Sequence, residues 1–250
     1  MILSIENLHF SYPKKDILNN INFSLEEGDF LAVLGTNGVG KSTLLKCLNK
    51  ILEPQSGQIY LNDKDISELN GSYIAQNIAY VPQSHSYSRK TVFDSVLLGR
   101  KPYIKWDIEK KDIEIVENVL KLLELEEYSL SYTSELSGGE LQKVVIARAL
   151  AQEPKVLLMD EPTSNLDLKN QIEVLEIVQE IIKTQKISAI ITMHDLNLAL
   201  RFANKFLLLK DGEIFDFGDD TIVNPQSIKE VYDVDVIIEK YSGIPVVIPI

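Results

Sequence analysis

The stretch Gly35-Thr36-Asn37-Gly38-Val39-Gly40-Lys41-Ser42-Thr43 decides the fold. The apolar segment before it, residues 30–34, has the character of a strand, and the run from Lys41 keeps helical periodicity until just before Pro54. A strand, a glycine loop and a helix in this order are the parts that a phosphate-binding loop requires. Such a loop uses glycines for close backbone approach, a lysine for the β- and γ-phosphates and a hydroxyl for Mg²⁺. The candidate nucleotide-binding residues are therefore Gly35, Asn37, Gly38, Gly40, Lys41, Ser42 and Thr43.

The elements around this loop predict an α/β protein. Strands are expected at 2–8, 21–25 and 30–34, and again at 155–159, 188–192 and 206–209 with helices between them. Alternating strands and helices favour a mainly parallel sheet, so we expect a phosphate-loop NTPase core with an added N-terminal antiparallel β region. Charged helical patterns between Val81-Pro82-Gln83 and the later strands predict an inserted α-helical lobe.

The length of 250 residues fits a single domain, 1–250. Within it we expect a core at 1–85 and 153–223, the helical lobe at 86–152 and a short C-terminal extension at 224–250. The extension should form a capped helix followed by two strands around Ser242-Gly243.

The run Val156-Leu157-Leu158-Met159-Asp160-Glu161 predicts the second half of the phosphate site. Its apolar part is typical of a buried parallel strand, and ligands of open α/β sheets bind beyond the carboxyl ends of strands. Asp160 is then placed to bind Mg²⁺, directly or through water, and Glu161 to polarise an attacking water. The alternative is two acidic residues in an ordinary turn before Pro162.

A second glycine-rich turn, Leu136-Ser137-Gly138-Gly139-Glu140, opens another predicted helix. Ser137 and Glu140 have the spacing of a capping box, which is the simplest interpretation. A cap does not call for two successive glycines, each of which costs about 1 kcal/mol within a helix. Close approach by a ligand or by another backbone would explain that cost.

Composition narrows the class of function. The chain has 37 acidic and 25 basic residues and a formal net charge of −12, which disfavours nucleic acid as a partner. The single cysteine, Cys47, cannot form an internal disulfide. Because no apolar run approaches about 20 residues and no secretion signal is visible, we expect a soluble, cytoplasmic protein. Any work at a membrane would then depend on another polypeptide.

Along essentially its whole length the chain resembles the ATP-binding subunits of ABC transporters. The phosphate loop, the segment Leu136 to Glu140 and the strand Leu157 to Glu161 match three motifs of that family. Gln83 after Val81-Pro82 is similar to the family's glutamine loop, and His194 to its switch histidine. Tyr12 matches the aromatic residue that stacks on adenine, and Asp167, in Ser164-Asn165-Leu166-Asp167, belongs to a segment resembling the loop that crosses to a partner subunit. Taken singly, Gln83 could be any loop amide, His194 a structural histidine and Tyr12 a strand aromatic.

The resemblance implies an ATPase with ATP and Mg²⁺ as its ligands. Its catalytic residues would be Glu161, His194, Gln83 and Lys41, and its metal site would include Ser42, Gln83 and Asp160. It also implies a head-to-tail homodimer, in which Ser137, Gly138 and Gly139 contact the ATP of the partner copy and Asp167 makes a dimer contact. One departure is Glu140-Leu141-Gln142, where many members carry Gln-Arg-Gln or Gln-Gln-Arg. It leaves Ser137 and both glycines in place.

Within the family, the segment from Thr91 to Tyr103 is similar to the ATPases of iron-siderophore, haem and cobalamin importers. The resemblance implies integral-membrane permease subunits as partners, an external solute-binding protein as an indirect one, and a position on the inner face of the membrane. An ordinary amphipathic helix ending at Gly99 is the alternative for this segment. Three other functions remain open: another type of transporter, a non-transport ABC ATPase acting on nucleic acid or translation, and a nucleotide-binding subunit that dimerises without turnover. The transported chelate and the direction of transport stay undetermined.

Overall fold

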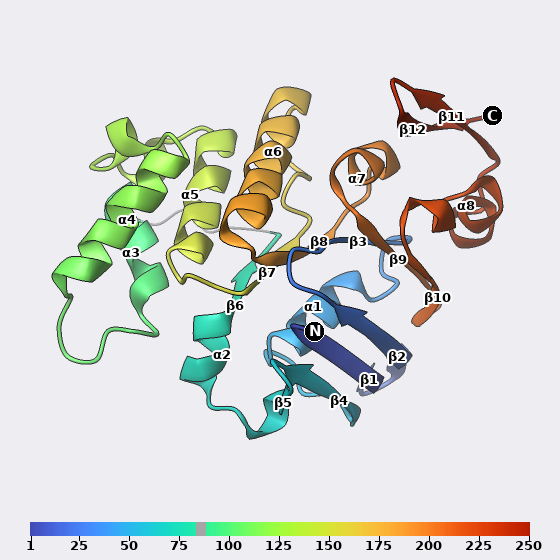
Figure 1. Cartoon of the computed structure of the whole chain (residues 1–250), viewed down its shortest axis with the longest axis horizontal. Coiled ribbons are helices and arrows are strands. Elements are labelled where there is room, and N and C mark those ends of the chain that lie inside the picture. Colours follow the sequence, from blue (N-terminus) through green and yellow to red (C-terminus); the bar gives the residue numbers. More distant parts are fainter. Residues whose placement is uncertain (84–88) are drawn as a thin grey trace.

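Two main sheets with their covering helices, a lobe of helices and a two-stranded C-terminal hairpin make up the described part of the chain, which is shown as a computed structural model in Figure 1. The structure describes residues 1–83 and 89–250. The lobe occupies one end of the molecule and the C-terminal hairpin the other, with the sheets between them. The boundary expected between residues 85 and 86 lies outside the described residues.

The larger sheet is mainly parallel, as predicted. Its strand order is β10-β9-β3-β8-β7-β6, in which only the edge strand β10 runs antiparallel to its neighbour. The bounds are Glu213–Gly218 for β10, Lys205–Lys210 for β9, Phe30–Leu34 for β3, Ser188–Thr192 for β8, Val156–Asp160 for β7 and Ile78–Val81 for β6. Every residue of β3, β7 and β8 is buried, because helices cover both faces of the sheet.

Alternation along β3 divides the interior into two cores. Leu31 and Val33 pack on one face with Leu44 and Leu45 of helix α1 (Lys41–Leu48). Phe30, Ala32 and Leu34 pack on the other with residues of α5 (Gly138–Leu150), α6 (Leu168–Gln185) and α7 (Leu196–Phe202). Helix α1 ends earlier than the expected stop at Pro54, because Asn49 and Lys50 leave the helical conformation and Lys50 adopts a φ of 53°.

The smaller sheet is the predicted antiparallel β region, with strand order β2-β1-β4-β5. Strands β1 (Leu3–Tyr12) and β2 (Lys15–Leu25) are longer than expected and form a hairpin, which places Tyr12 at the end of β1. Strands β4 (Ser56–Leu61) and β5 (Lys64–Asp65) extend the sheet. A 3-10 turn at Ile66–Glu68 and helix α2 (Gly71–Asn77) lead from there to β6.

The lobe contains α3 (Val92–Leu97), a 3-10 turn at Leu98–Arg100, α4 (Lys110–Leu122), further 3-10 turns at Glu126–Tyr128 and Thr133–Glu135, and α5. Arg100 joins these parts: its buried guanidinium donates to Asp112 of α4 (2.9 Å), to Glu153 (2.8 Å) and to the carbonyl of Ala151 at the end of α5 (2.8 Å). A buried charge needs such partners, because its desolvation is otherwise unfavourable by several kcal/mol. Arg100 thus fixes α4 against the segment that leads into β7.

The C-terminal extension forms the expected helix and two strands. After a 3-10 turn at Asp220–Ile222, Asn224 caps α8 (Pro225–Tyr232), and β11 (Val236–Tyr241) pairs with β12 (Ile244–Pro249) across Ser242-Gly243. Strand β12 packs on α7, where Asn197 accepts from the Val247 N–H (2.7 Å) and donates to its carbonyl (3.3 Å). The extension is therefore fastened to the core at α7.

Among the described residues, every helix is too short or too polar to cross a bilayer. Cys47 is buried in α1, and this burial raises the pKa of its thiol to about 12. The thiol is therefore an inert part of the core.

Gly99 provides a stability prediction. A Cβ at this position would overlap the backbone carbonyl of Arg148 and lie 3.0 Å from the Cβ of Ala151, so Gly99→Ala should destabilise the fold by about 1–3 kcal/mol. The measurement is urea unfolding followed by circular dichroism. Gly71→Ala is the matched control, because a Cβ there meets open space at the start of α2. Equal unfolding midpoints for the two variants would contradict the close packing of Gly99.

Candidate functional site

The glycine loop connects the end of β3 to the start of α1, as the sequence predicts. Gly35, Gly38 and Gly40 have φ values of 147°, 78° and 118°, a region that other residues rarely adopt. A Cβ on Gly35 would also run into the carbonyl of Leu209, and one on Gly40 would lie 3.0–3.1 Å from Leu18 and Ile17. The loop thus folds back on β9 and β2, with its N–H groups at the beginning of a helix, where anions bind readily.

Lys41 lies inside this loop with only 5% of its surface exposed. Its Nζ donates to the carbonyls of Gly35 (2.7 Å) and Thr36 (3.1 Å). Burial lowers the pKa of Lys41, and the nearby carboxylates of Glu161 and Asp160 oppose that change. Phosphate oxygens at the loop would be stronger acceptors for this ammonium group than the two carbonyls are.

Asp160 ends β7 and is 3% exposed. It accepts hydrogen bonds from Ser42 Oγ (2.8 Å), Thr192 Oγ1 (3.0 Å) and the Tyr80 hydroxyl (3.2 Å). Burial raises the pKa of Tyr80, and the adjacent Asp160 carboxylate adds to the effect. Thr192 and Tyr80 are not among the predicted site residues; their signal in the sequence is a polar group within an otherwise apolar strand beside β7.

The oxygen atoms of Ser42 and Asp160 suit Mg²⁺, which takes hard oxygen ligands from one or two protein groups and completes its shell with phosphate and water. Within the described residues no cluster of three or more His, Cys, Asp or Glu side chains forms a metal site by itself. Ser42 and Asp160 therefore fit a magnesium ion that arrives with a nucleotide.

Glu161, His194 and Gln83, which are far apart in the sequence, meet in one place. Glu161 Oε1 is 2.5 Å from His194 Nε2, and Gln83 Nε2 donates to Glu161 Oε2 (2.5 Å). Glu161 has a φ of 48°, a strained conformation for a non-glycine residue, and its N–H donates to Thr192 Oγ1 (2.8 Å). The turn directs the Glu161 side chain away from buried Asp160, so that the two adjacent carboxylates occupy different environments.

Tyr12 lies apart from these groups, at the end of β1. The residue is 45% exposed, and its ring packs edge-on against Phe10, with ring centroids 5.0 Å apart. A hollow of about 320 Å³ adjoins the glycine loop and is lined by Lys15, Asp16, Ile17, Thr36, Asn37, Gly38, Val39, Asp211 and Gly212. Stacking of adenine on Tyr12 stays a prediction.

The second glycine turn opens α5 as a capping box. Ser137 Oγ accepts from the Glu140 N–H (3.4 Å), and Glu140 Oε2 accepts from the Ser137 N–H (2.7 Å). The two glycines have different environments: a Cβ on Gly138 would meet nothing within 4 Å, whereas one on Gly139 would lie 2.7 Å from Asn170 Oδ1 of α6. Gly139 therefore serves packing inside this chain, and Gly138 is the glycine left open to an approaching group.

Asp167 caps α6, because its Oδ1 accepts from the Asn170 N–H (2.8 Å). Through Asn170 the start of α6, which Asp167 caps, and the second glycine turn are neighbours. The glycine turn opens α5 of the lobe and Asp167 opens the neighbouring helix α6, whereas the glycine loop opens α1 in the core (Figure 1).

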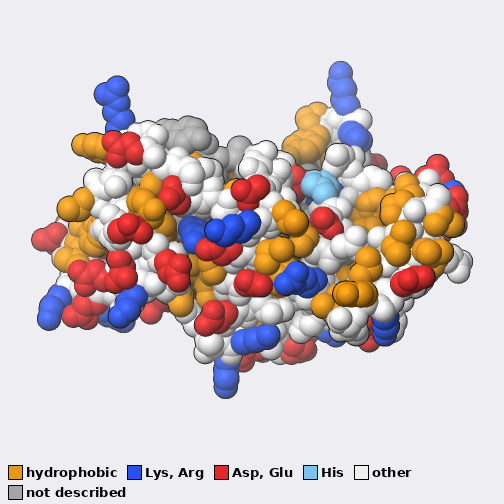
Figure 2. Space-filling model, turned by 90° about the horizontal axis from the view of Figure 1, so that it is seen from above, with side chains coloured by type: hydrophobic (Ala, Val, Ile, Leu, Met, Phe, Trp, Pro, Cys, Tyr) orange, Lys and Arg blue, Asp and Glu red, His pale blue; other side chains and the backbone are white. Residues whose placement is uncertain are grey.

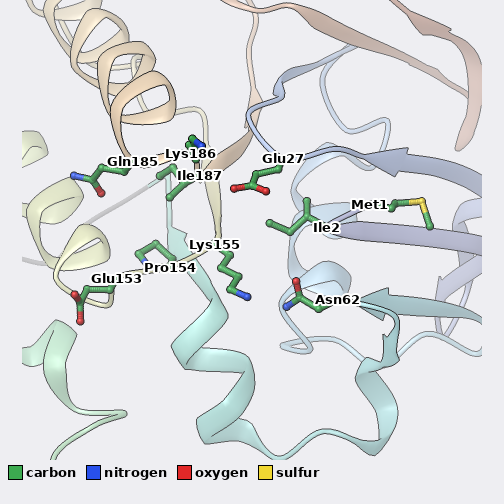
Figure 3. A pocket seen from close by; sticks show the side chains of 10 residues that line it. All are labelled: Met1, Ile2, Glu27, Asn62, Glu153, Pro154, Lys155, Gln185, Lys186 and Ile187. Carbon is green, nitrogen blue, oxygen red and sulfur yellow. The ribbon is translucent and has the colours of Figure 1, made fainter.

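A larger hollow, of about 430 Å³, lies at the amino ends of the strands of the larger sheet (Figure 3). It is lined by Met1, Ile2, Glu27, Asn62, Glu153, Pro154, Lys155, Gln185, Lys186 and Ile187, several of which directly precede β7 and β8. Since ligands of open α/β sheets bind at the carboxyl ends of the strands, this hollow at the amino ends is not the candidate site.

Comparison with known proteins is consistent with this geometry. The family model described as ABC transporter matches residues 18–164. The chain is 57% identical over 250 residues, covering 100% of this chain and 98% of the relative, to an uncharacterised ABC transporter ATP-binding protein of Methanocaldococcus jannaschii. It is 34% identical over 253 residues, covering 99% and 92%, to an ATP-binding protein of Bacillus subtilis assigned to a siderophore transport system.

Two solved structures are similar throughout. One is an inward-facing ABC transporter assigned to the metal-chelate type, with a TM-score of 0.87 and 34% identity, covering 100% of this chain and 97% of that one. The other is a dimeric bacterial ABC transporter cassette, with a TM-score of 0.77 and 26% identity, covering 87% and 98%.

Thr192 offers a test of the hydrogen-bonded site. Thr192→Val keeps the shape of the side chain but removes a donor to Asp160 and the acceptor of the Glu161 N–H, so it should destabilise the fold by about 1–3 kcal/mol in urea unfolding. Thr184→Val is the control, because the Thr184 hydroxyl bonds only to the Glu180 carbonyl on an exposed helix face. It should change stability by less than about 0.5 kcal/mol. Equal losses in both variants would remove Thr192 from this role.

Proposed function

Because the chain belongs to the family of ABC transporter ATP-binding proteins, which hydrolyse ATP to drive transport, we propose that it powers an importer of a metal chelate. The chelate would be of the iron-siderophore, haem or cobalamin class. The observation that carries the catalytic part is the meeting of Glu161, His194 and Gln83 beside the glycine loop. The transport class is supported by the relative assigned to a siderophore system and by the metal-chelate type transporter.

The proposed reaction is attack of water on the γ-phosphate of ATP. Glu161 accepts a proton from the water, while His194 and Gln83, which both bond its carboxylate, hold that water and the γ-phosphate in line. Lys41 exchanges the carbonyls of Gly35 and Thr36 for phosphate oxygens. Ser42 and Asp160 would hold Mg²⁺, which would supply positive charge beside the phosphates.

We infer that two copies of the chain complete each site. Ser137 and Gly138 are exposed, and the open space over Gly138 allows a phosphate group of the partner's ATP to approach the start of α5. Two-fold symmetry makes the arrangement reciprocal, so that Asp167 of each copy lies at the same interface. The similar dimeric cassette supports this assembly.

The membrane partners follow from the same proposal. Integral-membrane permease subunits would hold the chain at the inner face of the membrane, and an external solute-binding protein would act through them. Function on nucleic acid is disfavoured by the net charge of −12. The face drawn in Figure 2 agrees, since its basic side chains are interspersed with acidic and apolar ones.

Glu161→Gln tests the catalytic assignment. The amide cannot accept the proton of the attacking water, so ATP hydrolysis measured by phosphate release should fall by about 10²-fold or more, while ATP affinity changes by less than about twofold. Lys41→Ala is the contrasting variant, because it should weaken binding as well as hydrolysis. Full turnover in Glu161→Gln would remove Glu161 from the role of base.

The importer assignment has a separate test. Phosphate release by the purified chain should rise severalfold when it is combined with membrane subunits of a metal-chelate importer in lipid vesicles, because those subunits would hold two copies face to face. Membrane subunits of an unrelated exporter provide the control. Stimulation by the exporter subunits alone would contradict the importer class while leaving the ATPase assignment intact.

A further inference from the structure

The hydroxyl group of Ser137 is already engaged within its own chain. Ser137 Oγ donates to Glu140 Oε2 (2.7 Å), the same oxygen that accepts from the Ser137 backbone N–H (2.7 Å). Glu140 also bonds Tyr128, and these hydrogen bonds hold the pKa of the Glu140 carboxyl below its ordinary value. At neutral pH Glu140 therefore carries a negative charge.

This bond matters because a serine hydroxyl has one proton to donate. A γ-phosphate presents acceptor oxygens only, and so does an ionised carboxylate. If Ser137 is to bond the partner's ATP, it must release Glu140, and the released carboxylate then stands beside a phosphate of like charge. The basic residue nearest in the helix, Lys143, is itself paired with Glu173 of α6 (2.5 Å).

The cap itself does not require this charge. A glutamine at the third helical position closes a capping box as well as a glutamate does. Its amide can also donate to Ser137 Oγ, which would leave the hydroxyl proton of Ser137 free for a phosphate. Helix capping therefore does not account for the negative charge at position 140.

We propose that Glu140 opposes ATP-dependent pairing of two copies, by holding the hydroxyl proton of Ser137 and by placing a negative charge beside the partner's nucleotide. This inference rests on the head-to-tail assembly proposed above. Glu140 acts through Ser137 and is a positioning residue. Its effect would be to make the closed pair short-lived, so that the two copies separate readily once the γ-phosphate has left.

The test uses the chain with Glu161→Gln, in which ATP is retained, and adds Glu140→Gln. The dimer dissociation constant is measured by analytical ultracentrifugation at saturating ATP and Mg²⁺, and ATP affinity is measured below the concentration at which pairs form. Glu140→Gln should tighten the dimer by about fivefold at low salt, with ATP affinity of the separate copies unchanged. The difference should shrink in 1 M salt, where charges are screened.

Glu117→Gln is the matched control, because Glu117 is an exposed acidic residue on α4 of the same lobe. It should change the dimer dissociation constant by less than twofold. A Glu140→Gln dimer no tighter than its parent would overturn the inference, as would equal tightening by both variants. If the Glu161→Gln parent forms no ATP-dependent dimer at any concentration, the head-to-tail assembly itself fails, and that result is distinguishable because it needs no change at Glu140.

Discussion

The buried carboxylate of Asp160 is the interaction on which the rest of the site depends. It receives hydrogen bonds from Ser42 of α1, Thr192 of β8 and Tyr80 of β6, so one side chain joins the glycine loop to two neighbouring strands. A carboxylate buried at 3% exposure is stable only with such donors. The register of β7 with β8, which sets Asp160 opposite Thr192, is therefore as necessary to the site as the loop itself.

The position of Asp160 also determines that of the next residue, Glu161. Thr192 bonds both Asp160 and the N–H of Glu161, so a single hydroxyl orients two adjacent carboxylates with different tasks. The left-handed backbone at Glu161 then turns its side chain toward His194 and Gln83. The strain at this residue is tolerated because β7 and β8 are completely buried on either side of the turn.

The sequence predicted those features of the site and of the C-terminal extension that consist of contiguous motifs. The glycine loop, Asp160 after an apolar strand, and the helix and hairpin of the C-terminal extension were all visible from spacing and periodicity. Thr192, Tyr80 and the contact of Gly139 with Asn170 were not, because each depends on which elements become neighbours in the folded chain. Strand β4 was missed for a local reason: Ile59 and Leu61 are its only buried residues, too few to form a pattern.

The attachment of the last strand links the C-terminal extension to the helix that follows His194. Asp195, the residue after His194, caps α7, and Asn197 lies in the first turn of this helix. The Asn197 side chain accepts a hydrogen bond from the Val247 N–H and donates one to the Val247 carbonyl. A chain cut anywhere before β12 would leave that side chain without either bond and the outer surface of α7 uncovered. The extension thus acts as a brace for α7, the helix that begins two residues after His194.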